Sequence, residues 1–127
     1  MRTLYQEELD YLFSRKALCV RGALVISAFV EGQIWLLAEP IFEKEGVIPK
    51  PRGQYSESIR VLKRDNVLSP QELKQIEGFR TERNIAFHAI FKGMTRGEWV
   101  QQNNKVVELG RPIVQNLDKK LDLLKSD

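Results

Sequence analysis

The most restrictive feature of the sequence is the stretch 23–45, which is apolar on nearly every side when it is placed on a helix. A helix of this kind belongs in the middle of a bundle or at an interface between subunits. Its most apolar window, residues 22–30, lies between Arg21 and Glu31 and is about nine residues long, whereas a membrane span needs roughly 20. We therefore expect a buried helix and no membrane partner.

The remaining sequence also has helical periodicity, without a convincing run of strict alternation. The pattern predicts helices over residues 3–20, 23–45, 54–65, 69–92 and 95–124. A chain of 127 residues can bury a core without disulfides or metals. We expect an all-α fold, an up-and-down bundle of four to five helices that forms a single domain over residues 1–127.

Capping and breaking residues mark the ends of these helices. Ser69 with Glu72, and Thr95 with Glu98, have the spacing of a capping box, in which each side chain bonds the other residue's backbone N–H. Prolines and glycines should kink or end the second helix, end the fourth, and bend or split the last. These residues are Pro40 and Gly46, Gly93, and Gly110 with Pro112.

One cysteine and one histidine exclude several kinds of chemistry. Cys19 is the one cysteine, so it cannot form a disulfide within the chain. A single cysteine fits a reducing, cytoplasmic location. A zinc site of the His/Cys type cannot form in a single copy, and no glycine loop has the spacing of a phosphate-binding motif. We expect no metal and no cofactor. A reaction that needs two imidazoles would require a second chain.

Positive charge is concentrated in the middle of the chain. Residues 50–97 carry ten basic and five acidic side chains, although the whole chain has a net charge of only +3. Such a concentration suits a polyanion such as RNA, and a solvated surface of mixed charge explains it equally well. The candidate RNA-binding residues, which lie around Tyr55 in the sequence, are Lys50, Arg52, Arg60, Lys63 and Arg64.

One arginine interrupts the apolar face of the fourth predicted helix. Arg83 falls near the centre of that face, where a guanidinium must have a partner or line a cleft. Asn84 and His88 are one turn apart at the edge of the same face, so the three side chains could converge. Arginine suits phosphate oxygens, and histidine exchanges protons near neutral pH. The apolar residues of this face are Leu73, Ile76, Phe79, Ala86, Phe87, Ile90 and Phe91.

These residue types fit a metal-independent attack of an RNA 2′-OH on the adjacent phosphate. A second interpretation gives Arg83 a structural role, held by a buried carboxylate for which Glu31 is the candidate. A lone histidine beside an apolar face is more often structural than catalytic. The chain would then be a non-catalytic module that binds protein, nucleic acid or nucleotide. Burial of Arg83 and the direction of His88 separate the two interpretations.

The segment from Phe79 to His88 resembles the signature of the HEPN superfamily: an arginine, a polar residue that is often asparagine, and a histidine a few residues later. The resemblance implies a helical bundle that dimerises with its two motif helices adjacent. Many members are metal-independent endoribonucleases in toxin–antitoxin, anti-phage or RNA-processing systems, whereas others keep the fold without cleaving RNA.

Carried over to this chain, the resemblance matches Arg83 and His88 to the family's catalytic pair and Asn84 to its polar position. The partners that it implies are RNA, a second copy, and an antitoxin or regulatory protein. One toxin subgroup, partnered with a nucleotidyltransferase antitoxin, has tyrosine two residues after the histidine, where this chain has Ile90.

Overall fold

Residues 1–125 are described in a computed structural model, and this part of the chain contains helices and turns but no strand. The all-α bundle predicted from the sequence is confirmed. The α-helices are α1 (Leu4–Leu12), α2 (Val20–Glu45), α3 (Gln54–Arg64), α4 (Pro70–Phe87) and α5 (Arg96–Lys125). Three short 3-10 turns lie between them: η1 (Arg15–Ala17), η2 (Pro51–Gly53) and η3 (Ala89–Lys92).

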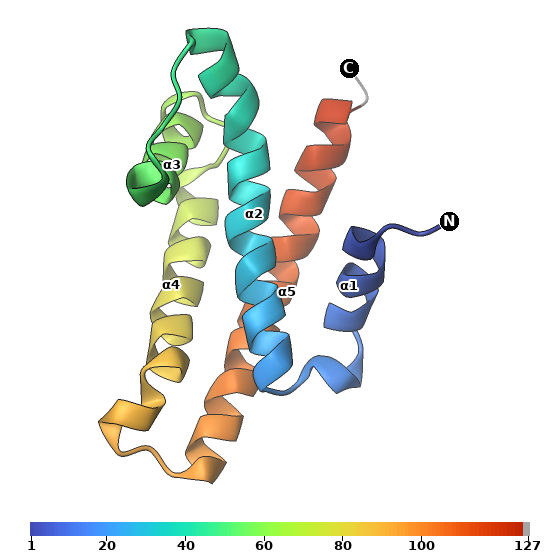
Figure 1. Cartoon of the computed structure of the whole chain (residues 1–127), viewed down its shortest axis with the longest axis vertical. Coiled ribbons are helices and arrows are strands. Elements are labelled where there is room, and N and C mark those ends of the chain that lie inside the picture. The colour runs from blue at the N-terminus through green and yellow to red at the C-terminus, as the bar shows by residue number, and fades with distance from the viewer. Residues whose placement is uncertain (126–127) are drawn as a thin grey trace.

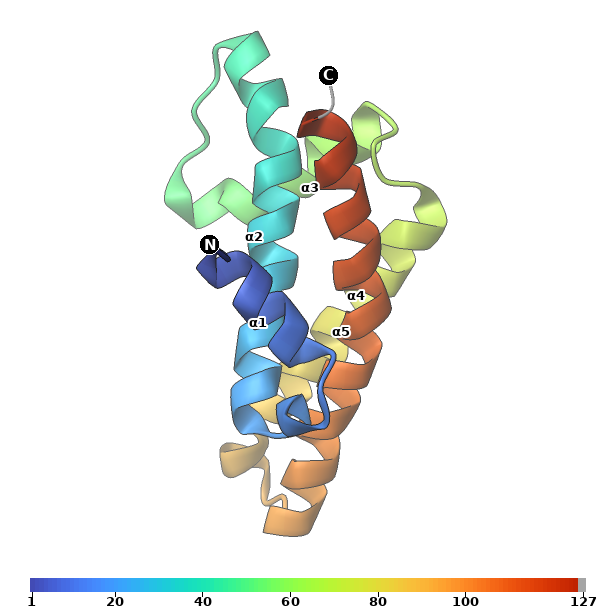
Figure 2. The same ribbon diagram turned by 90° about the vertical axis from the view of Figure 1, so that its right-hand side faces the viewer.

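The long helices α2, α4 and α5 alternate in direction along the length of the molecule (Figure 1). α2 and α5 run the same way, α4 runs against both, and α1 covers only the lower part of the face that α2 and α5 share. α3 crosses behind α2 instead of running along it (Figure 2). α2 therefore has a neighbour on most sides, as its apolar sequence requires.

The core is built around α2. Ile26, Val30, Ile34 and Leu37 of this helix are buried. By length and composition α2 is also apolar enough to cross a membrane, but the core helix of a globular bundle meets the same criterion. α5 approaches α2 closely at Gly110, where an added Cβ would lie 2.6 Å from Ile26 Cδ1. A larger residue at this position would therefore force the side chains of Ile26 and Phe79 to shift.

Both predicted capping boxes are present. The backbone N–H of Glu72 donates to Ser69 Oγ at 3.1 Å, and the N–H of Ser69 donates to Glu72 Oε1 at 2.8 Å. Thr95 and Glu98 make the same pair of bonds at 3.2 and 3.0 Å. These bonds satisfy donors that a helix start leaves free, and they fix where α4 and α5 begin.

The first helix is shorter than the sequence pattern predicts, because it ends at Leu12 and not near residue 20. Arg111 of α5 donates to the carbonyls of Leu12 and Ser14, at 2.7 and 2.8 Å. A distant side chain thus satisfies acceptors at the end of α1, and the chain turns there. The turn then packs so closely on α2 that a Cβ at Gly22 would lie 1.7 Å from the Ala17 carbonyl oxygen.

Pro40 does not end its helix, and Gly110 with Pro112 does not split the last one, so one of the two outcomes expected at each place is excluded. α2 continues through Pro40 and ends at Gly46, which has the left-handed φ of 68°. α5 runs unbroken through Gly110 and Pro112. Both prolines are exposed, so water can bond the carbonyls that lose their helical donors.

Candidate functional site

The second half of α4 is attached firmly to α5. Trp99 Nε1 donates to the Ala86 carbonyl at 3.1 Å, and Gln102 Nε2 donates to the Glu82 carbonyl at 2.9 Å. Lys105 adds an ion pair with the Glu82 carboxylate at 2.5 Å. These contacts hold one side of α4, so that Arg83 and Asn84 are presented from a fixed backbone.

Arg83 lies between α4 and α2 and is held by a carboxylate. Its Nη1 is 2.5 Å from Glu31 Oε1, and its side chain is only 12% exposed. Its Cζ atom also lies 5.7 Å from the centre of the Phe87 ring. The partner foreseen for this arginine is therefore correct, although the Glu31 side chain is 46% exposed and not buried.

Asn84 turns its side chain toward Arg83. Asn84 Oδ1 accepts from Arg83 Nη2 at 3.0 Å and from Nε at 3.3 Å. The structure thus brings Arg83 and Asn84 together. Within the described chain no hydrogen bond joins either side chain to the His88 imidazole, so the expected contact between Asn84 and His88 is not made.

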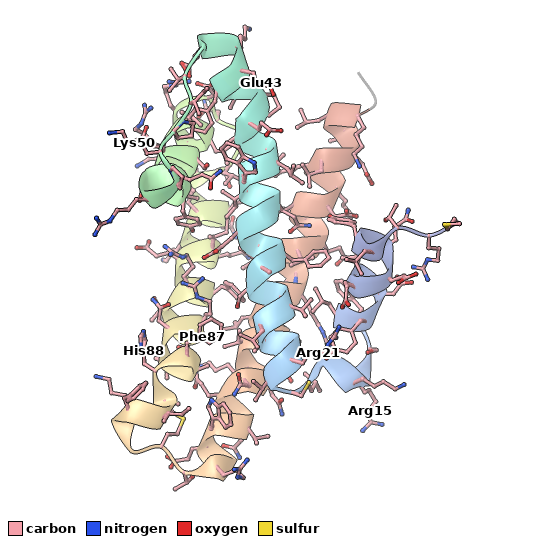
Figure 3. The ribbon with its side chains drawn as sticks, viewed as in Figure 1. Arg15, Arg21, Glu43, Lys50, Phe87 and His88 are labelled. Carbon is pink, nitrogen blue, oxygen red and sulfur yellow. The ribbon has the colours of Figure 1, made fainter. Side chains whose placement is uncertain are left out.

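His88 ends α4. The helix stops at Phe87, five residues before the predicted end, and the His88 N–H donates to the Asn84 carbonyl at 3.0 Å. The side chain is exposed. It lies on the outer side of the lower end of α4, away from α2 and α5 (Figure 3). Gly93 was expected to end this helix but instead ends the η3 turn, where it has a left-handed φ of 73°.

The change from helix to η3 turn overturns part of the predicted apolar face. Phe87, Ile90 and Phe91 were expected to face inward, but they are 41%, 73% and 84% exposed. The turn redirects Ile90 and Phe91, whereas the prediction assumed a continuous helix. Phe87 is the last residue of α4, so the turn does not explain its exposure. These three side chains flank His88 in sequence and form what we call the α4-end apolar cluster.

The five candidate RNA-binding residues are spread along η2 and α3, with Lys50 immediately before them. Arg60 pairs with Glu57 at 2.9 Å, and Arg64 pairs with Asp65 and Glu45. Lys50, Arg52 and Lys63 are exposed and, within the described chain, have no carboxylate partner. In Figure 3, Lys50 and His88 project from the same side of the molecule, and Arg15 lies on the opposite side.

A groove of about 550 Å³ separates α3 from α4. The sequence pattern did not single out Arg80, which lines this groove and whose Cζ atom lies 3.9 Å from the centre of the Tyr55 ring. Burial raises the pKa of the Tyr55 hydroxyl, and the Arg80 charge opposes that change. Asn84, which accepts hydrogen bonds from Arg83, is also one of the residues that line the groove.

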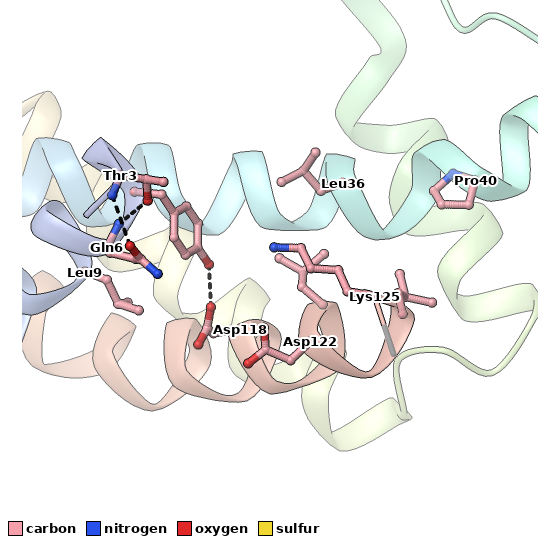
Figure 4. A pocket seen from close by; sticks show the side chains of 11 residues that line it. Thr3, Gln6, Leu9, Leu36, Pro40, Asp118, Asp122 and Lys125 are labelled. Atoms are coloured by element: carbon pink, nitrogen blue, oxygen red, sulfur yellow. Dashed lines mark hydrogen bonds between the residues drawn. The ribbon is translucent and has the colours of Figure 1, made fainter. Parts of the chain in front are cut away.

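A second hollow, of about 700 Å³, lies between α1, α2 and α5 (Figure 4). The Tyr5 hydroxyl donates to Asp118 Oδ1 at 2.7 Å and accepts from Gln33 Nε2 at 3.0 Å. Burial, with the Asp118 carboxylate nearby, raises the pKa of Tyr5 to about 12. None of the residues proposed from the sequence lines this hollow, and its hydrogen bonds join α1 to α5.

Cys19 is half-buried. Its Sγ lies 3.4 Å from the Tyr11 hydroxyl, an interaction that lowers the pKa of the thiol. No group of three or more His, Cys, Asp or Glu side chains gathers to hold a metal ion among residues 1–125.

Comparison with known proteins adds no relative to this picture. No family model, no curated protein and no solved structure matches the chain.

Proposed function

We propose that this chain is a metal-independent endoribonuclease whose site is completed when two copies bring their α4 helices together. Arg83, Asn84 and His88 supply the reacting groups. The observation that carries the proposal is the fixed Arg83 guanidinium, which is 12% exposed, is oriented by Glu31 and Asn84, and lies five residues before the exposed His88. A cation held in advance stabilises developing charge without having to reorganise during the reaction.

The proposed reaction needs two proton transfers. One imidazole takes the proton of a ribose 2′-OH, whose oxygen then attacks the adjacent phosphorus. Arg83 stabilises the extra negative charge on the phosphoryl oxygens. A second imidazole gives a proton to the departing 5′-oxygen. The products are a 2′,3′-cyclic phosphate and a 5′-hydroxyl.

The chain contains one histidine, so the second imidazole must come from another copy. The α4-end apolar cluster supports this assembly. Ile90 and Phe91 are 73% and 84% exposed beside His88, and burying such side chains against a partner is favourable. The arrangement would place both His88 side chains near one two-fold axis.

A second candidate function has its own supporting observation. The ion pair between Arg83 and Glu31 is what a structural arginine would make. In that case the chain is a non-catalytic HEPN-like dimer that binds or regulates a partner, such as an antitoxin or regulatory protein. Loss of Arg83 would then change stability and binding but no chemical step.

The direct test is incubation of the purified full chain with fluorescent single-stranded RNAs in excess EDTA. The proposal predicts cleavage that EDTA does not reduce. The products should carry 2′,3′-cyclic phosphates, which phosphatase removes only after acid has opened the ring. Ends with 3′-hydroxyls, or cleavage lost in EDTA, would contradict the mechanism. Binding of RNA without cleavage would favour the non-catalytic function.

A further inference from the structure

The groove between α3 and α4 contains an arginine that lacks a negatively charged partner. Three arginines are half-buried in the described chain: Arg80, Arg83 and Arg111. Arg83 has Glu31 and Asn84, and Arg111 has two backbone carbonyls. Arg80 has the face of the Tyr55 ring, no carboxylate within ion-pairing distance, and an Nε atom that is buried without a hydrogen bond.

Burying half of such a guanidinium costs free energy, because some of its desolvated N–H groups have no hydrogen-bond acceptor. The Tyr55 ring offsets part of the cost through a cation–π contact. An anion in the groove would supply the missing acceptors. Phosphate oxygens fit especially well, since the guanidinium fork can donate two parallel hydrogen bonds to them.

The lining of the groove indicates what else the ligand contains. Its floor is apolar, and its rim carries a second cation, Lys63, with the hydroxyl-bearing residues Ser56 and Thr81. Glu77 is the acidic residue in the lining, so the two cations outweigh it. A volume of about 550 Å³ is in the range of small-ligand sites. The apolar floor residues are Ile59, Leu73 and Ile76.

From these observations we infer that the α3–α4 groove binds a nucleoside phosphate, with the phosphate at Arg80 and Lys63 and the base over the apolar floor. Because the groove reaches Asn84, a nucleotide here would continue toward Arg83. The ligand is then one nucleotide of an RNA strand on its way to the cleavage site. A free nucleotide has the same chemistry, and identifying RNA as its source rests on the proposed function.

The test compares binding to two probes, a short fluorescent single-stranded RNA and free adenosine monophosphate. RNA binding is measured in the His88→Ala background, so that the strand stays intact. Arg80→Gln should weaken RNA binding about tenfold, as loss of a charge-assisted contact does. It should also lower the slope of log affinity against log salt by about 0.7, the value for one phosphate contact on a single strand.

Two further variants control for charge. Arg15→Gln removes the same charge on the opposite side of the molecule and should change RNA affinity less than twofold. Glu77→Gln removes a negative charge from the groove and should strengthen binding. If Arg80→Gln and Arg15→Gln have equal effects, or if Glu77→Gln weakens binding, the inference is overturned.

A nuclear magnetic resonance titration tests the same groove without removing Arg80. Added adenosine monophosphate should shift the backbone amides of Ser56, Lys63 and Thr81 and leave that of Arg15 unchanged. Binding of the free nucleotide without RNA binding would support the groove and overturn RNA as the source. Failure of both probes to bind the wild-type chain would overturn the inference. Absence of RNA cleavage alone would contradict the proposed function and leave the groove intact.

Discussion

Arg83 Nη1 lies 2.5 Å from Glu31 Oε1, and this contact joins α4 to α2, whereas the exposed His88 lies on the outer side of the end of α4. The ion pair can have two roles: it can stabilise the bundle, or it can orient the guanidinium for a ligand. Because the Glu31 side chain is 46% exposed, water screens the pair, and its contribution to stability is no more than about 1 kcal/mol. Orientation of Arg83 is therefore the larger consequence.

The two roles predict different cleavage rates when Glu31 and Arg83 are substituted in turn. Glu31→Gln keeps an oxygen acceptor for Arg83 and should lower the cleavage rate less than about tenfold. Arg83→Gln should lower it by about 100-fold or more, because charge stabilisation in the transition state is lost. Both variants should reduce the free energy of unfolding by about 1 kcal/mol or less.

Initial cleavage rates and chemical denaturation measure these effects, with Arg15→Gln as the control for loss of charge. If the Glu31 and Arg83 variants lose the same free energy of unfolding and both cleave RNA at the same rate, Arg83 has a structural role.

The α4-end apolar cluster should determine the oligomeric state. Phe91→Asp places a charge in the proposed contact between copies and should shift the chain from dimer to monomer. Its side chain is 84% exposed, so the fold itself should tolerate the change. Leu123→Asp is the matched control, since Leu123 is 69% exposed near the other end of the bundle. Light scattering coupled to size-exclusion chromatography measures the mass. A wild-type monomer, or a Phe91→Asp dimer, argues against the assembly.

The packing of α5 on α2 can be tested at Gly110. Gly110→Ala would place a Cβ 2.6 Å from Ile26 Cδ1 and 2.8 Å from the Phe79 ring, so the core must shift. The expected loss in the free energy of unfolding is about 1–3 kcal/mol. Gly32→Ala, on the exposed side of α2 with open space around it, should instead gain up to about 1 kcal/mol. Urea denaturation measures both, and equal effects would contradict the close packing.

Glu72 should make stability depend on acid pH. Burial alone would raise the pKa of this carboxyl, but bonds from Ser69, Asn116 and Lys120 outweigh it and lower the pKa to about 2. In the unfolded chain the carboxyl titrates near its ordinary value of 4.5. The unfolded state therefore binds the proton first as pH falls. The stabilisation is complete above about pH 4.5 and is lost progressively toward pH 2.

Glu72→Gln keeps the capping geometry and removes the charge. It should cost about 1–2 kcal/mol at pH 7, and the difference from the wild type should shrink between pH 4.5 and 2. Urea midpoints across this range measure the difference, with the exposed Glu108→Gln as control. A difference that stays constant with pH would show that the charge of Glu72 is not what stabilises α4.

Local signals in the sequence were enough to predict much of the fold. Ser69 and Glu72 lie three residues apart, so the start of α4 could be predicted from a short stretch. The end of α1 could not, because the donor that satisfies its carbonyls is Arg111, 99 residues away from Leu12. The sequence could not decide whether each proline would end its helix or leave it continuous, because this depends on the exposure of the proline, which the fold determines.

The candidate site was predicted in part for similar reasons. An arginine on an apolar face needs a partner or a cleft, and Glu31 of the neighbouring helix, the candidate carboxylate, is the partner in the structure. The contact between Arg80 and Tyr55 could not be predicted from the sequence, because it depends on how α3 crosses the bundle. The exposure of Ile90 and Phe91 could not be foreseen from a helical wheel, because the wheel assumes that the helix continues where the η3 turn begins.

The central claim is that His88 transfers protons during RNA cleavage. The most direct measurement compares the rates at which the His88→Ala variant and the wild type cleave RNA in EDTA, after both have been shown to have the same oligomeric mass. Removal of a general acid and base should lower the rate by about 100-fold or more, with RNA affinity nearly unchanged. A variant that cleaves as fast as the wild type would contradict the account.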